Sequence, residues 1–126
     1  MSEIKTDKLT GVGTAGVILV TGEGNSTTTN LQQGLAKAWN NTNSAGTTIN
    51  DSFNISSLGD TSTGRQNHNV TNNFANANFV PTLSVAANYN QQWTSSLTTG
   101  GWRTNNFTGS EYIDIQIRTI SSGDLA

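Results

Sequence analysis

The alternation of apolar and polar residues predicts a chain made mainly of short β-strands. Side chains of a strand point alternately to its two faces, and Ile113, Ile115 and Ile117 alternate with polar neighbours at that period. We expect this strand to turn its isoleucines toward the core. Weaker signals of the same period, at 70–74 and 83–89, predict two further strands that belong to one antiparallel sheet.

An earlier strand is predicted where Ile49, Asp51, Phe53 and Ile55 share one parity. Glycine, aspartate and serine follow at close intervals between residues 59 and 64, and such residues favour turns. We therefore expect this strand to end in a loop.

One segment has the period of a helix instead. Its apolar residues are Leu31, Leu35, Ala38 and Trp39. With Thr29 or Asn30 as the N-cap, they predict a short helix of about ten residues.

The first 24 residues carry isolated charges, one short apolar run at 17–20, and several glycines. We divide the chain into an extended N-terminal arm, residues 1–24, and a compact β-rich domain, residues 25–126. The segment Gly11-Val12-Gly13-Thr14-Ala15-Gly16 has the dinucleotide-binding pattern, which needs a buried strand before it and a helix after it. Its flanks are polar on one side and strand-like on the other, so we predict turn glycines and no cofactor.

Half of the chain is small and polar. Asn, Thr, Ser and Gly make up 63 of 126 residues, whereas Leu, Ile, Val and Phe together number 26. So few apolar side chains offset little of the conformational entropy lost on folding, and we expect copies of the chain to associate.

Charge and hydropathy exclude several classes of partner. Six basic and eight acidic residues leave a net charge of −2, and the basic residues form no stripe, so we expect no nucleic-acid binding. No apolar run approaches the roughly 20 residues that span a bilayer, and the chain starts without an apolar signal region. We expect that the protein does not insert into a membrane. We also expect that it is synthesised in a cytoplasm.

The residues that could carry catalysis are sparse. His68 is the only histidine, and no nucleophile motif accompanies it, so we interpret it as a solvated loop residue. Glu111 and Asp114 are three residues apart, which puts them on opposite faces of a strand. The chain has no cysteine. We predict no catalytic residue, no metal site and no enzymatic activity.

An aromatic segment, residues 90–110, has no sustained period and is predicted to be a long loop or an irregular hairpin. Its candidate binding residues are Trp93, Trp102, Arg103, Asn105 and Phe107. Flat apolar rings beside amide groups suit a sugar or a protein surface, but the same rings could fill a core. We choose Trp102, beside a Gly-Gly turn, as an exposed recognition residue.

Four segments resemble tail-fibre-type virion proteins of marine bacteriophages, especially those of cyanophages. They are Ser2-Glu3-Ile4-Lys5-Thr6-Asp7-Lys8-Leu9, Gly34-Leu35-Ala36-Lys37-Ala38-Trp39, Asp51-Ser52-Phe53-Asn54-Ile55-Ser56-Ser57-Leu58 followed by Asp60 and Gly64, and Phe74-Ala75-Asn76-Ala77-Asn78-Phe79. The resemblance covers roughly residues 2–88. It implies an intertwined homotrimer of short strands around a shared core, with the arm attached to other virion proteins of the tail or capsid.

The sequence thus predicts a non-enzymatic virion structural protein, a trimeric tail fibre or fibre-like appendage that contacts a glycan or protein of the host surface. Two alternatives stay open: a capsid decoration protein, such as a head fibre or cement protein, and a carbohydrate-binding module.

Overall fold

The computed structural model describes residues 3–14, 17–21, 24, 27–85 and 91–126, and the chain forms two units, residues 1–35 and 36–126. Within the described residues the secondary structure is mainly antiparallel β with one short helix, as predicted. The boundary follows Leu35, eleven residues after the end of the predicted arm at residue 24.

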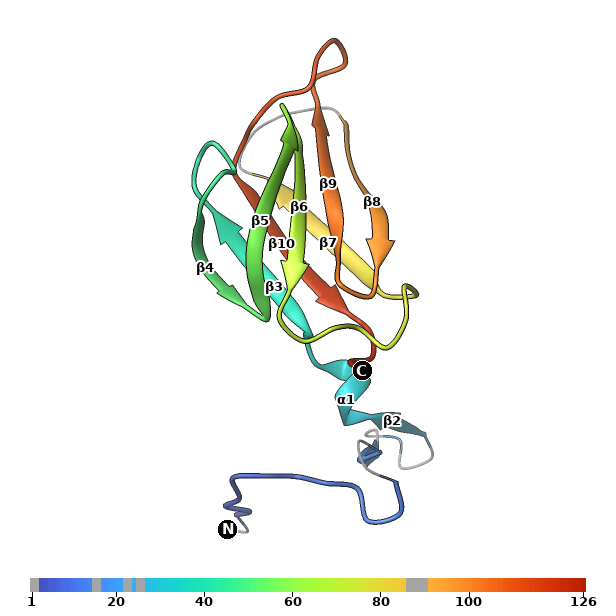
Figure 1. Ribbon diagram of the computed structural model, residues 1–126. Helices are drawn as coiled ribbons and strands as arrows, with labels where there is room; N and C mark the ends of the chain where they lie inside the picture. The colour runs from blue at the N-terminus through green and yellow to red at the C-terminus, as the bar shows by residue number, and fades with distance from the viewer. Residues whose placement is uncertain (1–2, 15–16, 22–23, 25–26, 86–90) are drawn as a thin grey trace. The chain divides into compact units, whose positions relative to one another are not determined.

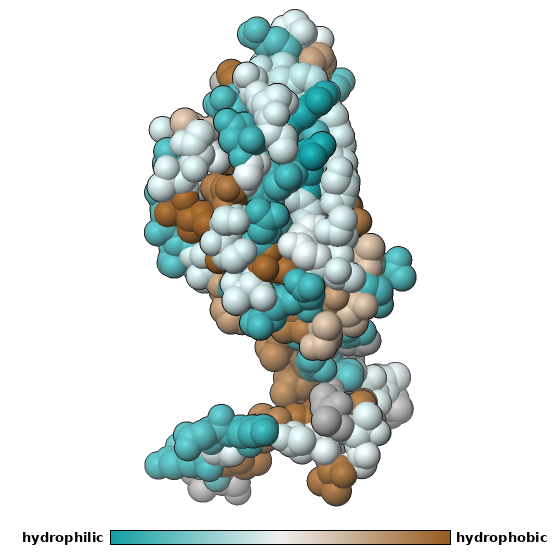
Figure 2. Space-filling view, viewed as in Figure 1, coloured by the Kyte–Doolittle hydropathy of each residue, from teal (hydrophilic) through white to brown (hydrophobic). Residues whose placement is uncertain are grey.

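Two four-stranded sheets form a β-sandwich in the second unit (Figure 1). The first sheet has the order β4-β3-β10-β7 and consists of β4 (Ile49–Phe53), β3 (Ala38–Thr42), β10 (Ile117–Ser122) and β7 (Val80–Val85). The second has the order β5-β6-β9-β8 and consists of β5 (Ile55–Ser62), β6 (Arg65–Val70), β9 (Gly101–Phe107) and β8 (Gln91–Thr98). All pairings are antiparallel. The outward face of the second sheet carries mostly hydrophilic and intermediate residues (Figure 2).

The chain passes from the first sheet to the second at Asn54, between β4 and β5. Asn54 has a positive φ of 57°, a conformation that asparagine tolerates better than most residues. Its Nδ2 donates to the carbonyl oxygens of Lys37, at 2.9 Å, and Asn72, at 3.1 Å, and its Oδ1 accepts from the backbone N–H of Asn72 at 2.7 Å. One side chain thus joins the corner to the start of β3 and the end of β6.

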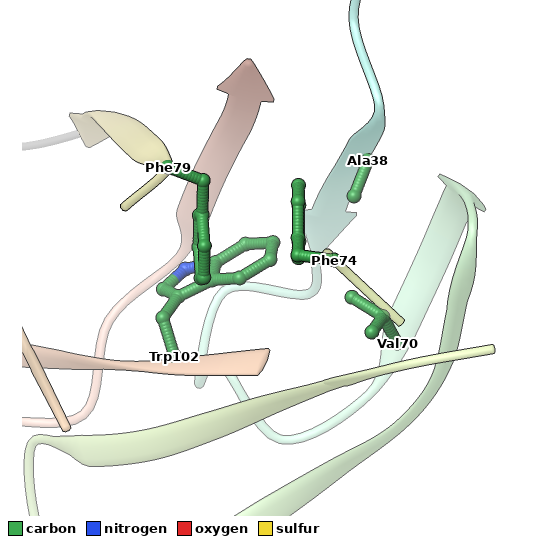
Figure 3. Packing of buried hydrophobic residues seen from close by; sticks show 5 residues of the cluster. All are labelled: Ala38, Val70, Phe74, Phe79 and Trp102. Atoms are coloured by element: carbon green, nitrogen blue, oxygen red, sulfur yellow. The ribbon is translucent and has the colours of Figure 1, made fainter. Parts of the chain in front are cut away.

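The apolar part of the interior is small. It consists of Ala38, Val70, Phe74, Phe79 and Trp102, all 8% exposed or less (Figure 3). The rings of Phe74 and Phe79 are stacked, with centroids 3.9 Å apart, and Phe79 meets Trp102 edge-on at 6.0 Å. These aromatic rings fill the space where the segment after β6 closes over the sandwich.

A chain of polar side chains fills much of the remaining interior. The Thr119 hydroxyl donates to Asn40 Oδ1 at 2.6 Å, and Asn40 Nδ2 lies 3.2 Å from His68 Nδ1. His68 Nε2 lies 3.0 Å from the Thr104 hydroxyl, which donates to the carbonyl of Gln66 at 3.4 Å. Because Asn40 presents its amide N–H groups to Nδ1, the consistent tautomer of His68 carries its proton on Nε2. The bonds run from β10 and β3 to β6 and β9, so they connect the two sheets.

The first unit contains β1 (Leu19–Thr21), β2 (Thr28–Asn30) and α1 (Leu31–Gly34). The two strands are antiparallel, and Asn30 caps the helix by accepting from the N–H of Gln32 at 2.9 Å. No described side chain of residues 3–35 is buried. The glycine-rich segment leads toward strand β1 and not into a helix, as predicted, although residues 15–16 lie outside the described part.

Several predicted elements are wrong in extent or partner. The helix ends at Gly34, because Ala38 and Trp39 belong to β3, where they face opposite sides of a strand. The strands β6 and β7, near the predicted 70–74 and 83–89, lie in different sheets, and residues 86–90 lie outside the described part. Residues 59–62 continue β5 and do not form a loop.

The last strand starts at Ile117, four residues later than Ile113. Ile115 and Ile117 are buried as predicted, whereas Ile113 is half-buried. Their burial lies within one subunit. Residues 91–107 form the β8–β9 hairpin, which has an irregular register between Ser95 and Thr98, so the hairpin alternative is confirmed for the described part of the segment 90–110.

Candidate functional site

The structure divides the five candidate binding residues between the two faces of the second sheet. Trp93, Arg103, Asn105 and Phe107 are on the outward side of the sheet, because Trp93 pairs with Asn105 across β8 and β9 and the others follow at every second position. Asn105 is only 4% exposed, and its Nδ2 donates to the Ser95 hydroxyl at 2.8 Å. Trp102 has the opposite parity and is 2% exposed, stacked on His68 with centroids 5.3 Å apart. The prediction that Trp102 is exposed is therefore wrong, since the strand that carries it turns this ring into the core.

The aromatic rings of the outward face gather around Tyr112. Phe107 meets this ring edge-on at 5.1 Å, and Trp93 lies at 6.2 Å. The guanidinium carbon of Arg65, from β6, lies 4.1 Å from the centroid of the same ring. Trp93 is 39% exposed, so the cluster offers an accessible ring next to a cation.

A polar hollow of about 240 Å³ lies on the same sheet, around Arg103. Its lining comes from three strands and consists of Asn67, Asn69, Ser96, Thr98, Gly101, Trp102 and Arg103. Arg103 Nε donates to Asn67 Oδ1 at 2.9 Å, and Asn69 Nδ2 donates to the Ser57 hydroxyl at 3.0 Å. These bonds hold the two asparagines and the guanidinium in place on the sheet surface.

Local backbone geometry shapes this hollow. Ser96 has a positive φ of 49° at the irregular point of β8, a strained conformation for a residue other than glycine. Gly101 has a φ of 145°, and a Cβ there would clash with the carbonyl oxygen of His68. Because only glycine fits, no side chain covers the surface beside Arg103.

The residues considered for catalysis lie elsewhere. His68 is fully buried and not a solvated loop residue, because β6 turns it inward, and burial lowers its pKa to about 4. Asp114 Oδ1 accepts from the N–H of Gly64, so this carboxylate caps a turn. Among the described residues no group of three or more His, Cys, Asp or Glu side chains could hold a metal ion.

Sequence reasoning missed four residues of the outward face: Arg65, Asn67, Asn69 and Tyr112. The first three alternate along β6, and this period of two in a polar segment was the available signal. Tyr112 follows a tight turn in which the Thr108 N–H donates to the carbonyl of Glu111 at 2.9 Å, and no sequence period marks that fold-back.

The sheets and the outward site define a β-sandwich with a polar, aromatic-lined surface. No protein-family model, curated protein or solved structure matches this chain. In the described part of the chain, no helix has the length and apolar character needed to cross a membrane.

Proposed function

We propose that the protein is a non-enzymatic structural component of a bacteriophage virion, a trimeric tail fibre or fibre-like appendage. The resemblance of residues 2–88 to such proteins suggests the class. The observation that carries the proposal is the contrast between the two units, because the second has a packed interior whereas the first has no buried side chain in its described part.

The first unit supports an attachment role through its uncovered apolar side chains. Leu9, Leu19 and Leu35 are 60%, 58% and 53% exposed, and Val20 is 48% exposed. Leaving so many large apolar side chains in water is unfavourable, and each contributes roughly 1.5–3 kcal/mol when fully buried. A neighbouring virion protein that covers these residues of the first unit would fix the chain to the particle.

The first sheet of the sandwich supports association between copies. Phe53, Trp39 and Ile120 are direct partners across β4, β3 and β10, and all three face outward. Phe53 and Ile120 are 50% and 48% exposed. Three apolar side chains in one row across a sheet form a surface that a second copy would cover, and in the proposed trimer each copy contributes one such row.

The structural role is also supported by the position of the polar groups. The only histidine connects the two sheets through Asn40 and Thr104. Its side chain is 0% exposed, which leaves no path for contact with a substrate. Glu111 and Asp114 lie outside the hollow around Arg103.

The experiment is electron microscopy of phage particles that carry a gold-labelled copy of the chain, with sedimentation velocity of the purified protein. We expect label on the tail and a mass of three chains. Label over the whole head would instead identify a capsid decoration protein. A stable monomer, or particles without label, would overturn the proposal.

A further inference from the structure

We propose that the hollow around Arg103 binds a hexuronic acid residue of an acidic polysaccharide. The site would serve the recognition role of the proposed appendage and rests on it. Attachment is measured on labelled phage particles, whereas sugar binding is measured on the purified protein. Either proposal can therefore fail while the other holds.

The charge of the hollow favours an anionic ligand. The guanidinium of Arg103 forms no ion pair within the described residues. No acidic residue lines the hollow. The bond from Arg103 Nε to Asn67 fixes the plane of the guanidinium and leaves its two terminal NH₂ groups for a carboxylate, which arginine binds with two parallel hydrogen bonds.

The remaining lining favours a ligand rich in hydroxyl groups. Asn67 and Asn69 stand on β6, and Ser96 and Thr98 on β8, so amide and hydroxyl groups face one another across Gly101. Each amide offers both a donor and an acceptor, and each hydroxyl can act as either. A bare anion would use the guanidinium alone, whereas a sugar acid would also use these four side chains.

Size and surroundings point to one ring of a longer chain. The volume of about 240 Å³ is below the roughly 300–1,000 Å³ of sites for drug-sized ligands. Two register pairs from Ser95 and Arg103 on the same face, Trp93 pairs with Asn105, and the Trp93 ring lies 6.2 Å from the ring of Tyr112. The exposed ring of Trp93 could stack on a second sugar while the acidic ring occupies the hollow.

Calorimetric titration of the full-length protein tests the site with four probes. Trigalacturonate and a trimannuronate carry the sugar acid in two configurations. The methyl ester of trigalacturonate keeps the rings but removes the charge, and a short polyglutamate peptide keeps the charge without the rings. We expect at least one of the two acidic trisaccharides to bind, and the ester and the peptide to bind at least tenfold more weakly.

Three variants locate the binding. Arg103→Gln should weaken the acidic trisaccharide at least tenfold, because the paired charge is lost. Thr98→Tyr places a large ring over the hollow from an exposed strand position and should abolish binding while Arg103 is kept. Arg118→Gln makes the same charge change on the other sheet, whose outward face lies away from the site, and should leave the affinity unchanged.

Four results would overturn the assignment. The first is that neither acidic trisaccharide binds. The second and third are that the methyl ester or the polyglutamate peptide binds with the same affinity as the acidic trisaccharide. The fourth is that Thr98→Tyr binds the acidic trisaccharide as tightly as the wild type does. Circular dichroism of each variant identifies loss of fold, and the exposed Thr98 position keeps the test valid if Arg103→Gln is unstable.

Discussion

His68 makes the stability of the sandwich sensitive to acid in a defined range of pH. Its side chain is 0% exposed, and burial lowers its pKa from 6.5 to about 4. A proton on Nδ1 would face the amide N–H groups of Asn40, which is a second reason for the neutral form. The unfolded chain exposes the ring to water and binds the proton near pH 6.5.

The magnitude follows from this difference in pKa. Above pH 6.5 the ring is neutral in both states, and its ionisation does not change the free energy of unfolding. As the pH falls below 6.5 the unfolded chain binds the proton first, so stability decreases until the folded ring also titrates near pH 4. The full difference is about 3 kcal/mol, of which about 2 kcal/mol is lost between pH 7 and pH 5.

Urea unfolding at pH 7, 6 and 5, at one fixed protein concentration, measures this loss. The matched variant is His68→Gln, which has no ionisable side chain but keeps all the carboxylates. It should be less stable at pH 7, yet it should lose about 2 kcal/mol less than the wild type between pH 7 and pH 5. Because His68 is the only histidine, its single NMR resonance also reports the titration directly. Equal losses in both proteins, or a native-state midpoint near 6.5, would refute the reasoning.

Four further tests, three by substitution and one by deletion, address other parts of the structure. Trp102→Ala should destabilise the sandwich by about 3–5 kcal/mol in thermal unfolding, because the ring is buried. A loss of stability below about 1 kcal/mol would indicate that the Trp102 ring is exposed after all. Ile120→Asp should shift sedimentation toward the monomer with little loss of monomer stability, whereas Asn76→Asp, the same charge in an exposed loop, should not. Asn54→Ala should lower stability by about 2–3 kcal/mol, and Asn54→Gly by about 1 kcal/mol less, since glycine relieves the positive φ but restores no hydrogen bond. Deletion of residues 2–20 should leave the melting temperature of the sandwich unchanged while particles lose the chain, and aggregation of this variant would show that the arm belongs to the core.

Part of the fold was readable from the sequence because strand periodicity is local. The β-rich class, the N-cap Asn30, and the burial of Ile115 and Ile117 all follow from neighbours within a few residues. The pairing of the strands could not be predicted from the sequence, because it depends on where the chain passes from one sheet to the other. That change occurs at Asn54, whose role comes from contacts with Lys37 and Asn72, 17 and 18 residues away in sequence.

The predicted helix is shorter than expected for a related reason. Leu31, Leu35 and Ala38 have helical spacing, but Lys37 and Ala38 are buried where β3 begins, and the N–H of Lys37 donates to the carbonyl of Ser121 at 2.8 Å. Pairing of β3 with β10 outweighs a weak helical preference, since a short helix gains little stability on its own.

Whether the candidate residues bind a ligand stays a prediction, but the exposure expected for Trp102 is wrong. Trp93, Arg103 and Phe107 are accessible on one side of the sheet and Asn105 is buried on that side, whereas Trp102 points into the core, because neighbouring positions of a strand face opposite sides. The faces of Trp102 and Arg103 follow from the regular pairing of β9 with β6, where Trp102 lies opposite His68 and Arg103 opposite Asn67. The irregular register of β8 instead places Ser96 and Thr98 at the hollow, and the sequence Thr94-Ser95-Ser96-Leu97 has no glycine or proline to mark it.

The interior also changes the argument for self-association. The composition suggested that several copies must pool their few apolar side chains, but the sandwich instead fills its interior with side chains such as Asn40, His68 and Thr104 that bond to one another across the sheets. A hydrogen-bonded interior satisfies polar groups that an apolar core would exclude, so a low content of Leu, Ile, Val and Phe is compatible with a folded single subunit. The case for a trimer therefore no longer depends on composition. It depends on the apolar row of Phe53, Trp39 and Ile120, and Ile120→Asp tests that row directly.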